Sequence, residues 1–309
     1  MVRPKHVLVT GAGGFVGYHL CSSLQANGLR VTRLYRHSPM GDDRFSFDSC
    51  AVDLEDESST KDLLYKLQPD CVVHLAASKF GRSDILSIRS YLDTDVPCAL
   101  NLIEACQSIK NFKRFVFMGS CDEYGPSYSS YMESLQPRPA SAYGLAKLAI
   151  TQLLIGLYLS SDFPAVVLRP SVVYGPAQTG NMFIPALIRA LAEGQDFPMT
   201  GGEQTRDFLY IGDLVETVIR VIFAGNEIDG KVINVGAGKS VDLKTVVNMV
   251  SRQVPGADVS RVRLGALDYR ANESMNYSVC IDLASKLLGW LPKTDMEKGL
   301  KLTVDYFLR

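Results

Sequence analysis

The sequence predicts an α/β fold of the Rossmann type, a doubly wound parallel sheet with a smaller, interleaved α/β domain. A β-branched run at residues 7–10 leads through a glycine-rich turn into an apolar-periodic helix. Strands and helices then alternate to about residue 119, which indicates right-handed βαβ crossovers and a sheet covered on both faces. Beyond residue 175, Gly, Pro and polar residues interrupt shorter elements.

That change in composition and in element length suggests two interleaved domains. The simplest partition assigns residues 1–174 and 207–236 to a dinucleotide-binding domain. Residues 175–206 and 237–309 then form the smaller, substrate-binding domain.

Composition fits a globular protein and argues against several partners. The chain has 309 residues, of which 47% are apolar and 21% charged. A formal net charge of −1 gives no reason to expect nucleic acid or an anionic membrane as a partner. We find no apolar run of the roughly 18 to 20 residues that a membrane span needs, and no signal peptide. Seven cysteines without metal-ligand spacing indicate reduced thiols in the cytoplasm and no metal site.

The glycine-rich turn is the candidate site for a dinucleotide pyrophosphate. Gly11 allows a tight turn, Gly14 lets a pyrophosphate approach the backbone, and Gly17 lets the helix lie close to the strand. Phe15 and Val16 open the helix, whose N-terminal N–H groups and dipole favour an anion. The alternative is a plain turn between strand and helix without a ligand.

The end of the second expected strand bears on the choice between NAD and NADP. A carboxylate at this position usually takes the ribose hydroxyls of NAD. The sequence has Tyr35-Arg36-His37 instead, and Arg36 could pair with a 2′-phosphate. The sequence therefore favours NADP(H) over NAD(H), unless Arg36 is an ordinary surface arginine.

Two more strand ends are expected to contact the cofactor. The third strand, residues 50–54, ends at Asp53 and Leu54, where a carboxylate could accept from the adenine amino group. The fourth strand ends in three side chains on which a flat cofactor could lie: Leu75, Ala76 and Ala77. His74 precedes them and is expected to pack within the sheet rather than act as a base.

A tyrosine and a lysine form the candidate catalytic pair. Tyr143 and Lys147 are four residues apart on a helix and therefore share one face. A nearby ammonium and an oxidised nicotinamide would both favour the phenolate of Tyr143, lowering its pKa from about 10. Tyr143 could then exchange a proton with an alcohol or ketone while a hydride moves to or from the nicotinamide. Ser120, at the end of an earlier strand, would offer its hydroxyl to the same oxygen.

These motifs resemble the extended short-chain dehydrogenases/reductases, in the group of nucleotide-sugar epimerases, dehydratases and 4-ketoreductases. The matching runs cover nearly the whole chain in order: residues 10–17, 74–77, 120–125, 143–147, 168–176, 205–213, 233–236 and 288–292. The resemblance implies that Ser120, Tyr143 and Lys147 are the catalytic triad, with Lys147 also bonding the nicotinamide ribose.

The same resemblance implies a nucleotide-diphosphate sugar as substrate. Arg206 and Arg270 match positions that hold its nucleotide part, and two arginines suit a diphosphate. Cys121 and Asn181 are also expected at the substrate. A homodimer is expected through the helices of residues 91–109 and 143–159.

Two departures from the family pattern affect the expected reaction. Val172 replaces an asparagine that often bonds the diphosphate. Dehydratases often follow the catalytic Ser or Thr with Asp-Glu, and here Cys121 and Asp122 occupy those positions. The Asp-Glu at 122–123 comes one residue late, which on a strand end reverses side-chain direction. This counts against dehydration, although Asp122 could still act as a base, and Cys121 fits a spacer better than a nucleophile.

The sequence therefore favours NADPH-dependent reduction of a nucleotide-linked 4-keto-6-deoxy sugar at C4, with Tyr143 as the acid. Epimerisation at C4 is the first alternative, and 4,6-dehydration the second. A non-catalytic dinucleotide sensor is a further alternative, against which the complete set of Ser120, Tyr143 and Lys147 argues.

Overall fold

The computed structural model describes residues 3–37, 48–78, 84–126, 130–178, 182–270 and 273–309. Its centre is a parallel sheet built from β1 (His6–Thr10), β2 (Arg30–Tyr35), β3 (Asp48–Ala51), β4 (Cys71–His74), β5 (Arg114–Met118), β7 (Ala165–Pro170) and β12 (Val232–Val235). The strand order is β12-β7-β5-β4-β1-β2-β3, and every neighbouring pair is parallel. The order reverses between β1 and β4, so the predicted doubly wound fold is confirmed.

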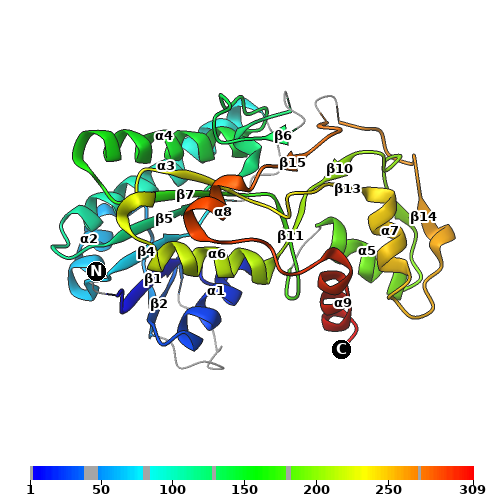
Figure 1. Cartoon of the computed structure of the whole chain (residues 1–309), viewed down its shortest axis with the longest axis horizontal. Helices are drawn as coiled ribbons and strands as arrows, with labels where there is room; N and C mark the ends of the chain where they lie inside the picture. The colour runs from blue at the N-terminus through cyan, green and yellow to red at the C-terminus, as the bar shows by residue number, and fades with distance from the viewer. Residues whose placement is uncertain (1–2, 38–47, 79–83, 127–129, 179–181, 271–272) are drawn as a thin grey trace.

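Helices cover both faces of this sheet (Figure 1). One face carries α1 (Phe15–Ala26), α6 (Ile211–Phe223) and α8 (Asp282–Leu288), and the other carries α2 (Glu57–Leu67), α3 (Ile85–Gln107) and α4 (Ala142–Ser161). Alternate residues of each strand enter the two cores. On β5, Val116 and Met118 pack towards α1 and α6, whereas Phe115 and Phe117 pack towards α3 and α4. Burial on both faces explains the nearly continuous apolar strands.

A smaller lobe lies at one end of the molecule and contains the C-terminus (Figure 1). Its core joins α5 (Phe183–Ala192), α7 (Leu243–Ser251) and α9 (Met296–Phe307). Short paired strands complete the chain: β6 (Ser130–Tyr131) with β15 (Ser278–Val279), β8 (Val172–Tyr174) with β11 (Phe208–Tyr210), β9 (Phe197–Pro198) with β14 (Val262–Arg263), and β10 (Thr205–Arg206) with β13 (Val241–Asp242). Trp290 and α8 pack in the core of the larger domain, although the predicted partition places them in the smaller one. The exact boundary stays a prediction.

Two element boundaries differ from the prediction. β3 ends at Ala51 rather than Leu54, because Asp53 begins a turn in which its carbonyl accepts from Asp56 N at 3.0 Å. The helix expected from residue 91 begins at Ile85, because Asp84 caps it by accepting from Ser87 N at 2.8 Å.

The expectation that no segment has the length and hydropathy of a membrane span was wrong for α4. By length and composition alone, α4 passes that test, since Lys147 is its only charged residue. However, α4 packs against α3 and β7 as a core helix does, so the composition is weak evidence for a membrane. Only 39% of its apolar window is buried, so much of its apolar surface faces outwards.

Candidate active site

The glycine turn has the close contacts that a dinucleotide site requires. Gly11 has φ of 63°, and a side chain there would lie 2.7 Å from Ala76 N. A side chain at Gly17 would collide with the backbone of Gly11 and Ala12. The N-cap of α1, Gly14, offers no side-chain cap, and the first turn of α1 holds no acidic residue. The first N–H groups of α1 therefore fit a pyrophosphate, and Phe15 and Val16 are the first two residues of this helix.

Thr10, just before this turn, is hydrogen-bonded to residues at the end of β4. Its Oγ1 accepts from Leu75 N at 3.2 Å and Ala76 N at 3.1 Å, and lies 2.8 Å from His74 Nδ1. The backbone that leads to Ala77 is thereby held beside the glycine turn, as expected for a surface that receives a flat cofactor. Burial lowers the pKa of His74 to about 3, with a smaller effect from Lys147. His74 is neutral and packs within the sheet, as predicted.

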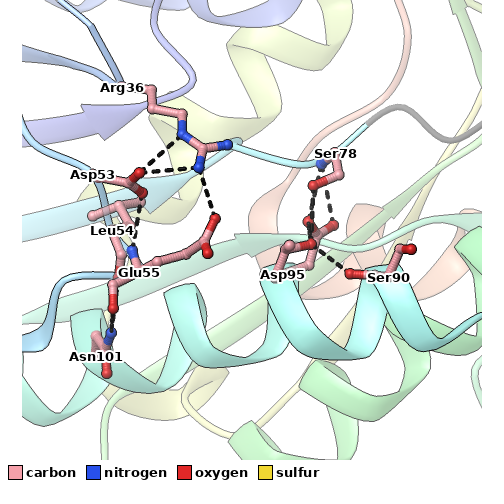
Figure 2. A network of polar contacts seen from close by, with 9 residues as sticks. Arg36, Asp53, Leu54, Glu55, Ser78, Ser90, Asp95 and Asn101 are labelled. Carbon is pink, nitrogen blue, oxygen red and sulfur yellow. Dashed lines mark hydrogen bonds and ion pairs between the residues drawn. The ribbon is translucent and has the colours of Figure 1, made fainter.

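The residues expected at the adenosine end of the cofactor bind one another (Figure 2). Arg36 Nε donates to Asp53 Oδ2 at 3.1 Å, and Arg36 Nη2 donates to Glu55 Oε1 at 2.9 Å. The contact with Asp53 raises the pKa of Arg36 above its ordinary value. Leu54 is buried, and Asn101 of α3 donates to its carbonyl at 2.8 Å. Arg36 thus already has two carboxylate partners, of which the sequence had indicated neither.

Lys147 occupies a buried position beside Tyr143. Ser141 caps α4 by accepting from Gly144 N at 2.9 Å. One turn later, Lys147 Nζ donates to Met118 O at 2.8 Å and lies 5.6 Å from the centre of the Tyr143 ring. Burial lowers the pKa of Lys147 to about 8.

The groups of the chain itself do not lower the pKa of Tyr143 as expected. Burial raises the pKa of Tyr143 above its ordinary value, and the charges of Asp122 and Glu123 add to the increase. The phenol is therefore protonated at neutral pH. A phenolate requires further positive charge at the site, which an oxidised nicotinamide would supply.

Ser120 sits at the start of a short 3-10 helix, η1 (Cys121–Glu123), directly after β5. Its Oγ accepts from Asp122 N at 3.1 Å, and its own N–H donates to Glu123 Oε1 at 3.0 Å. Glu123 is fully buried and forms a 2.7 Å ion pair with the buried Arg169 of β7. This pair fixes η1 against the sheet and so positions Ser120. Glu123 is a positioning residue that the sequence did not reveal as one.

The two residues between Ser120 and Glu123 have opposite environments. Cys121 is fully buried, donates to Arg169 O at 3.3 Å, and has a pKa raised well above its ordinary value by burial. The expected substrate contact of Cys121 is therefore wrong, whereas its interpretation as a spacer fits. Asp122 is exposed, and desolvation by the surrounding protein raises its pKa while Arg206 and Arg270 oppose the increase.

The structure therefore brings Tyr143, Arg206 and Arg270 within electrostatic reach of Asp122. Arg206 Nη1 donates to Thr205 O and Ser274 O, and Nη2 pairs with Glu273. Asn181 lies outside the described residues. Within the described ranges, no group of three or more His, Cys, Asp or Glu side chains is placed to hold a metal ion.

A doubly wound sheet with an open glycine turn, a Ser just after β5, and a Tyr and Lys pair on α4 define an extended short-chain dehydrogenase/reductase. The chain belongs to the NAD dependent epimerase/dehydratase family, whose sequence profile matches residues 7–236.

Known relatives span the whole chain. An uncharacterized UDP-glucose epimerase, YtcB of Bacillus subtilis, is 29% identical over an alignment of 320 residues that covers 97% of this chain and 97% of its own. The dTDP-glucose 4,6-dehydratase of Shigella flexneri is 25% identical over 98% of this chain and 92% of its own. The solved structure of MoeE5 in complex with UDP-glucuronic acid and NAD has a TM-score of 0.88 and 30% identity, and covers 99% of each chain.

Proposed function

We propose that this enzyme epimerises a nucleoside-diphosphate hexose at C4, with NAD as its cofactor. The observation that carries the proposal is the environment of η1. Dehydratases often have an Asp-Glu pair directly after the catalytic Ser or Thr. In the corresponding segment here, residues 121–123, Cys121 and Glu123 are buried and only Asp122 is exposed at the site. One carboxylate does not supply both the acid and the base that expel water, so oxidation and re-reduction at C4 fit better than elimination.

The chain's own residues account for the proton and the substrate. When bound, NAD would accept hydride from C4 and return it to the opposite face of the sugar. Tyr143 Oη takes the proton of the C4 hydroxyl and later returns it, while Ser120 Oγ donates to the same oxygen. Lys147 supplies a positive charge beside the phenol. Arg206 and Arg270 bind the diphosphate, which requires Arg206 to exchange Glu273 for the substrate.

Reduction of a nucleotide-linked 4-keto sugar is the second candidate. The raised pKa of Tyr143 favours it, because a protonated phenol is ready to donate to a ketone. A direct assay separates the two reactions. UDP-glucose or dTDP-glucose with catalytic NAD⁺ should yield the 4-epimer without net NADH. Stoichiometric oxidation of NADPH by a 4-keto-6-deoxy substrate, with no epimer formed, would instead identify a reductase.

Charge around Arg36 supports NAD(H) over the NADP(H) that the sequence favours. Asp53 and Glu55 outnumber the one guanidinium they bind, so a 2′-phosphate would meet a net negative surface. We expect the protein to bind NAD⁺ more tightly than NADP⁺ in calorimetric titrations. Glu55→Gln should raise the affinity for NADP⁺ by about 2- to 5-fold and leave NAD⁺ nearly unchanged, since the pair is exposed. Glu57→Gln is the control, because Glu57 pairs with Lys61 rather than with Arg36. Equal effects of both variants would refute this assignment.

We further propose that the protein is a homodimer through α3 and α4. Both helices expose leucines: Leu92 and Leu100 on α3, Leu145 and Leu159 on α4. Light scattering should give twice the 33.9 kDa of one chain. Leu92→Glu with Leu100→Glu should shift the protein to monomer, whereas Tyr65→Glu, at an exposed site on α2, should not. If light scattering shows that the parent protein is a monomer, the proposed homodimer is refuted.

A further inference from the structure

The ring of Phe117 lies against the ammonium of Lys147. Lys147 Nζ is 4.8 Å from the centre of the Phe117 ring, within the range in which a cation is attracted to an aromatic face. Phe117 is fully buried on β5, and Lys147 on α4 is 4% exposed. The contact is therefore shielded from water, where such an attraction is strongest.

Phe117 belongs to a row of residues that crosses the sheet. Thr10 of β1, His74 of β4 and Phe117 of β5 are in register, so their side chains point to the same face. Thr10 is hydrogen-bonded to His74, whose ring stacks on that of Phe117 at 5.8 Å between centres. The ring of Phe117 is thereby held in place from the side of the glycine turn.

Lys147 has few other groups to compensate its burial. Within the described chain, its Nζ makes one hydrogen bond, to Met118 O. Asp95 of α3 and Glu123 of η1 favour its charged form, while His74 is neutral and Tyr143 of the same helix is protonated. An ammonium has three donors, so a single carbonyl leaves it under-solvated and makes the aromatic contact important.

We propose that Phe117 is a positioning residue for the reaction, because its ring keeps Lys147 protonated and directed at the catalytic tyrosine. This inference rests on the proposed function only for its catalytic consequence; the effect on Lys147 itself is independent of the reaction. The ring face attracts only the charged form of Lys147. Removing the ring should therefore lower the pH at which the proton is lost, and the alkaline limb of the activity profile should move with it.

The test compares two substitutions on one strand. Phe117→Leu removes the ring beside Lys147, and Phe115→Leu removes an equally buried ring on the same face of β5, 6.1 Å from His74. Protein labelled with [ε-¹³C]lysine is titrated by NMR, and the Lys147 resonance is assigned by its loss in Lys147→Met. In the parent protein its midpoint is expected near pH 8. Phe117→Leu should lower the midpoint by at least about 0.5 pH unit, and Phe115→Leu should leave it in place.

Activity gives the second measurement. The alkaline midpoint of kcat should fall in Phe117→Leu by the same amount as the NMR midpoint. If Phe117→Leu does not fold, Phe117→Met, whose flexible unbranched side chain adapts better to the shape left by the ring, takes its place. Equal shifts in the two leucine variants, or no shift in the Phe117 variants, would overturn the proposal. Absence of any turnover by the parent protein would count against the proposed reaction alone, because the NMR titration needs no substrate.

Discussion

Tyr143→Phe is expected to lower kcat for 4-epimerisation by about 100- to 10,000-fold, because it removes the group that exchanges a proton with the C4 oxygen. The ring stays, so its packing against Tyr91, at 6.2 Å between ring centres, should survive. Steady-state assays of UDP-glucose or dTDP-glucose conversion with added NAD⁺ measure the effect.

The control for this prediction is Tyr158→Phe. It makes the same chemical change near the far end of the same helix, where the Tyr158 ring packs over Gly230 rather than at the site. The control should retain full activity, and both variants should bind NAD⁺ like the parent. Retention of more than a tenth of kcat in Tyr143→Phe would show that another group carries the proton.

Glu123→Gln is expected to lower the free energy of unfolding by about 3 to 5 kcal/mol. The substitution leaves the Arg169 guanidinium buried without its counter-charge, and it weakens the bond that holds the Ser120 backbone. Urea denaturation followed by circular dichroism measures the loss. The activity of the folded fraction should fall as well, because Ser120 caps η1 and Asp122 lies within it.

Two further variants sharpen this prediction. Asp48→Asn breaks a 2.7 Å ion pair with Arg30 in which both side chains are more than half exposed, and it should cost no more than about 1 kcal/mol. Adding Arg169→Met to Glu123→Gln removes the uncompensated charge and should restore part of the stability. If Glu123→Gln costs as little as Asp48→Asn, the buried pair does not hold η1.

Strong local patterns made most of the fold predictable. The glycine spacing, the buried apolar strands and the alternation with amphipathic helices each have one common structural solution, so the sheet and its major helices follow from sequence. Two-residue strands of the smaller lobe, such as β9 and β14, were not predicted, because two residues carry no periodicity. Some helix ends depend on a single capping bond: Ser87 N donates to Asp84, and α3 begins at Ile85, six residues before the expected start at residue 91.

The candidate site was predictable in its members but not in their pairing. Ser120, Tyr143 and Lys147 follow from motif spacing, and the structure places them at the carboxyl edge of the sheet. Arg36 was predicted to pair with a 2′-phosphate. The sequence does not show that the turn between β3 and α2 brings the carboxylates of Asp53 and Glu55 to this arginine. Likewise, nothing local in the sequence reveals that Glu123 meets Arg169, which lies 46 residues later. Such contacts depend on how strands pair.

In the proposed reaction, C4 of a nucleotide sugar is oxidised and reduced within one site, and Tyr143 accepts and returns the proton. The most direct measurement follows UDP-[4-²H]glucose or dTDP-[4-²H]glucose through the reaction with NAD⁺ in ordinary water. The product should be a 4-epimer that retains its deuterium at C4. Conversion in which that deuterium is replaced by solvent hydrogen, or a product that has lost water instead of inverting C4, would contradict it.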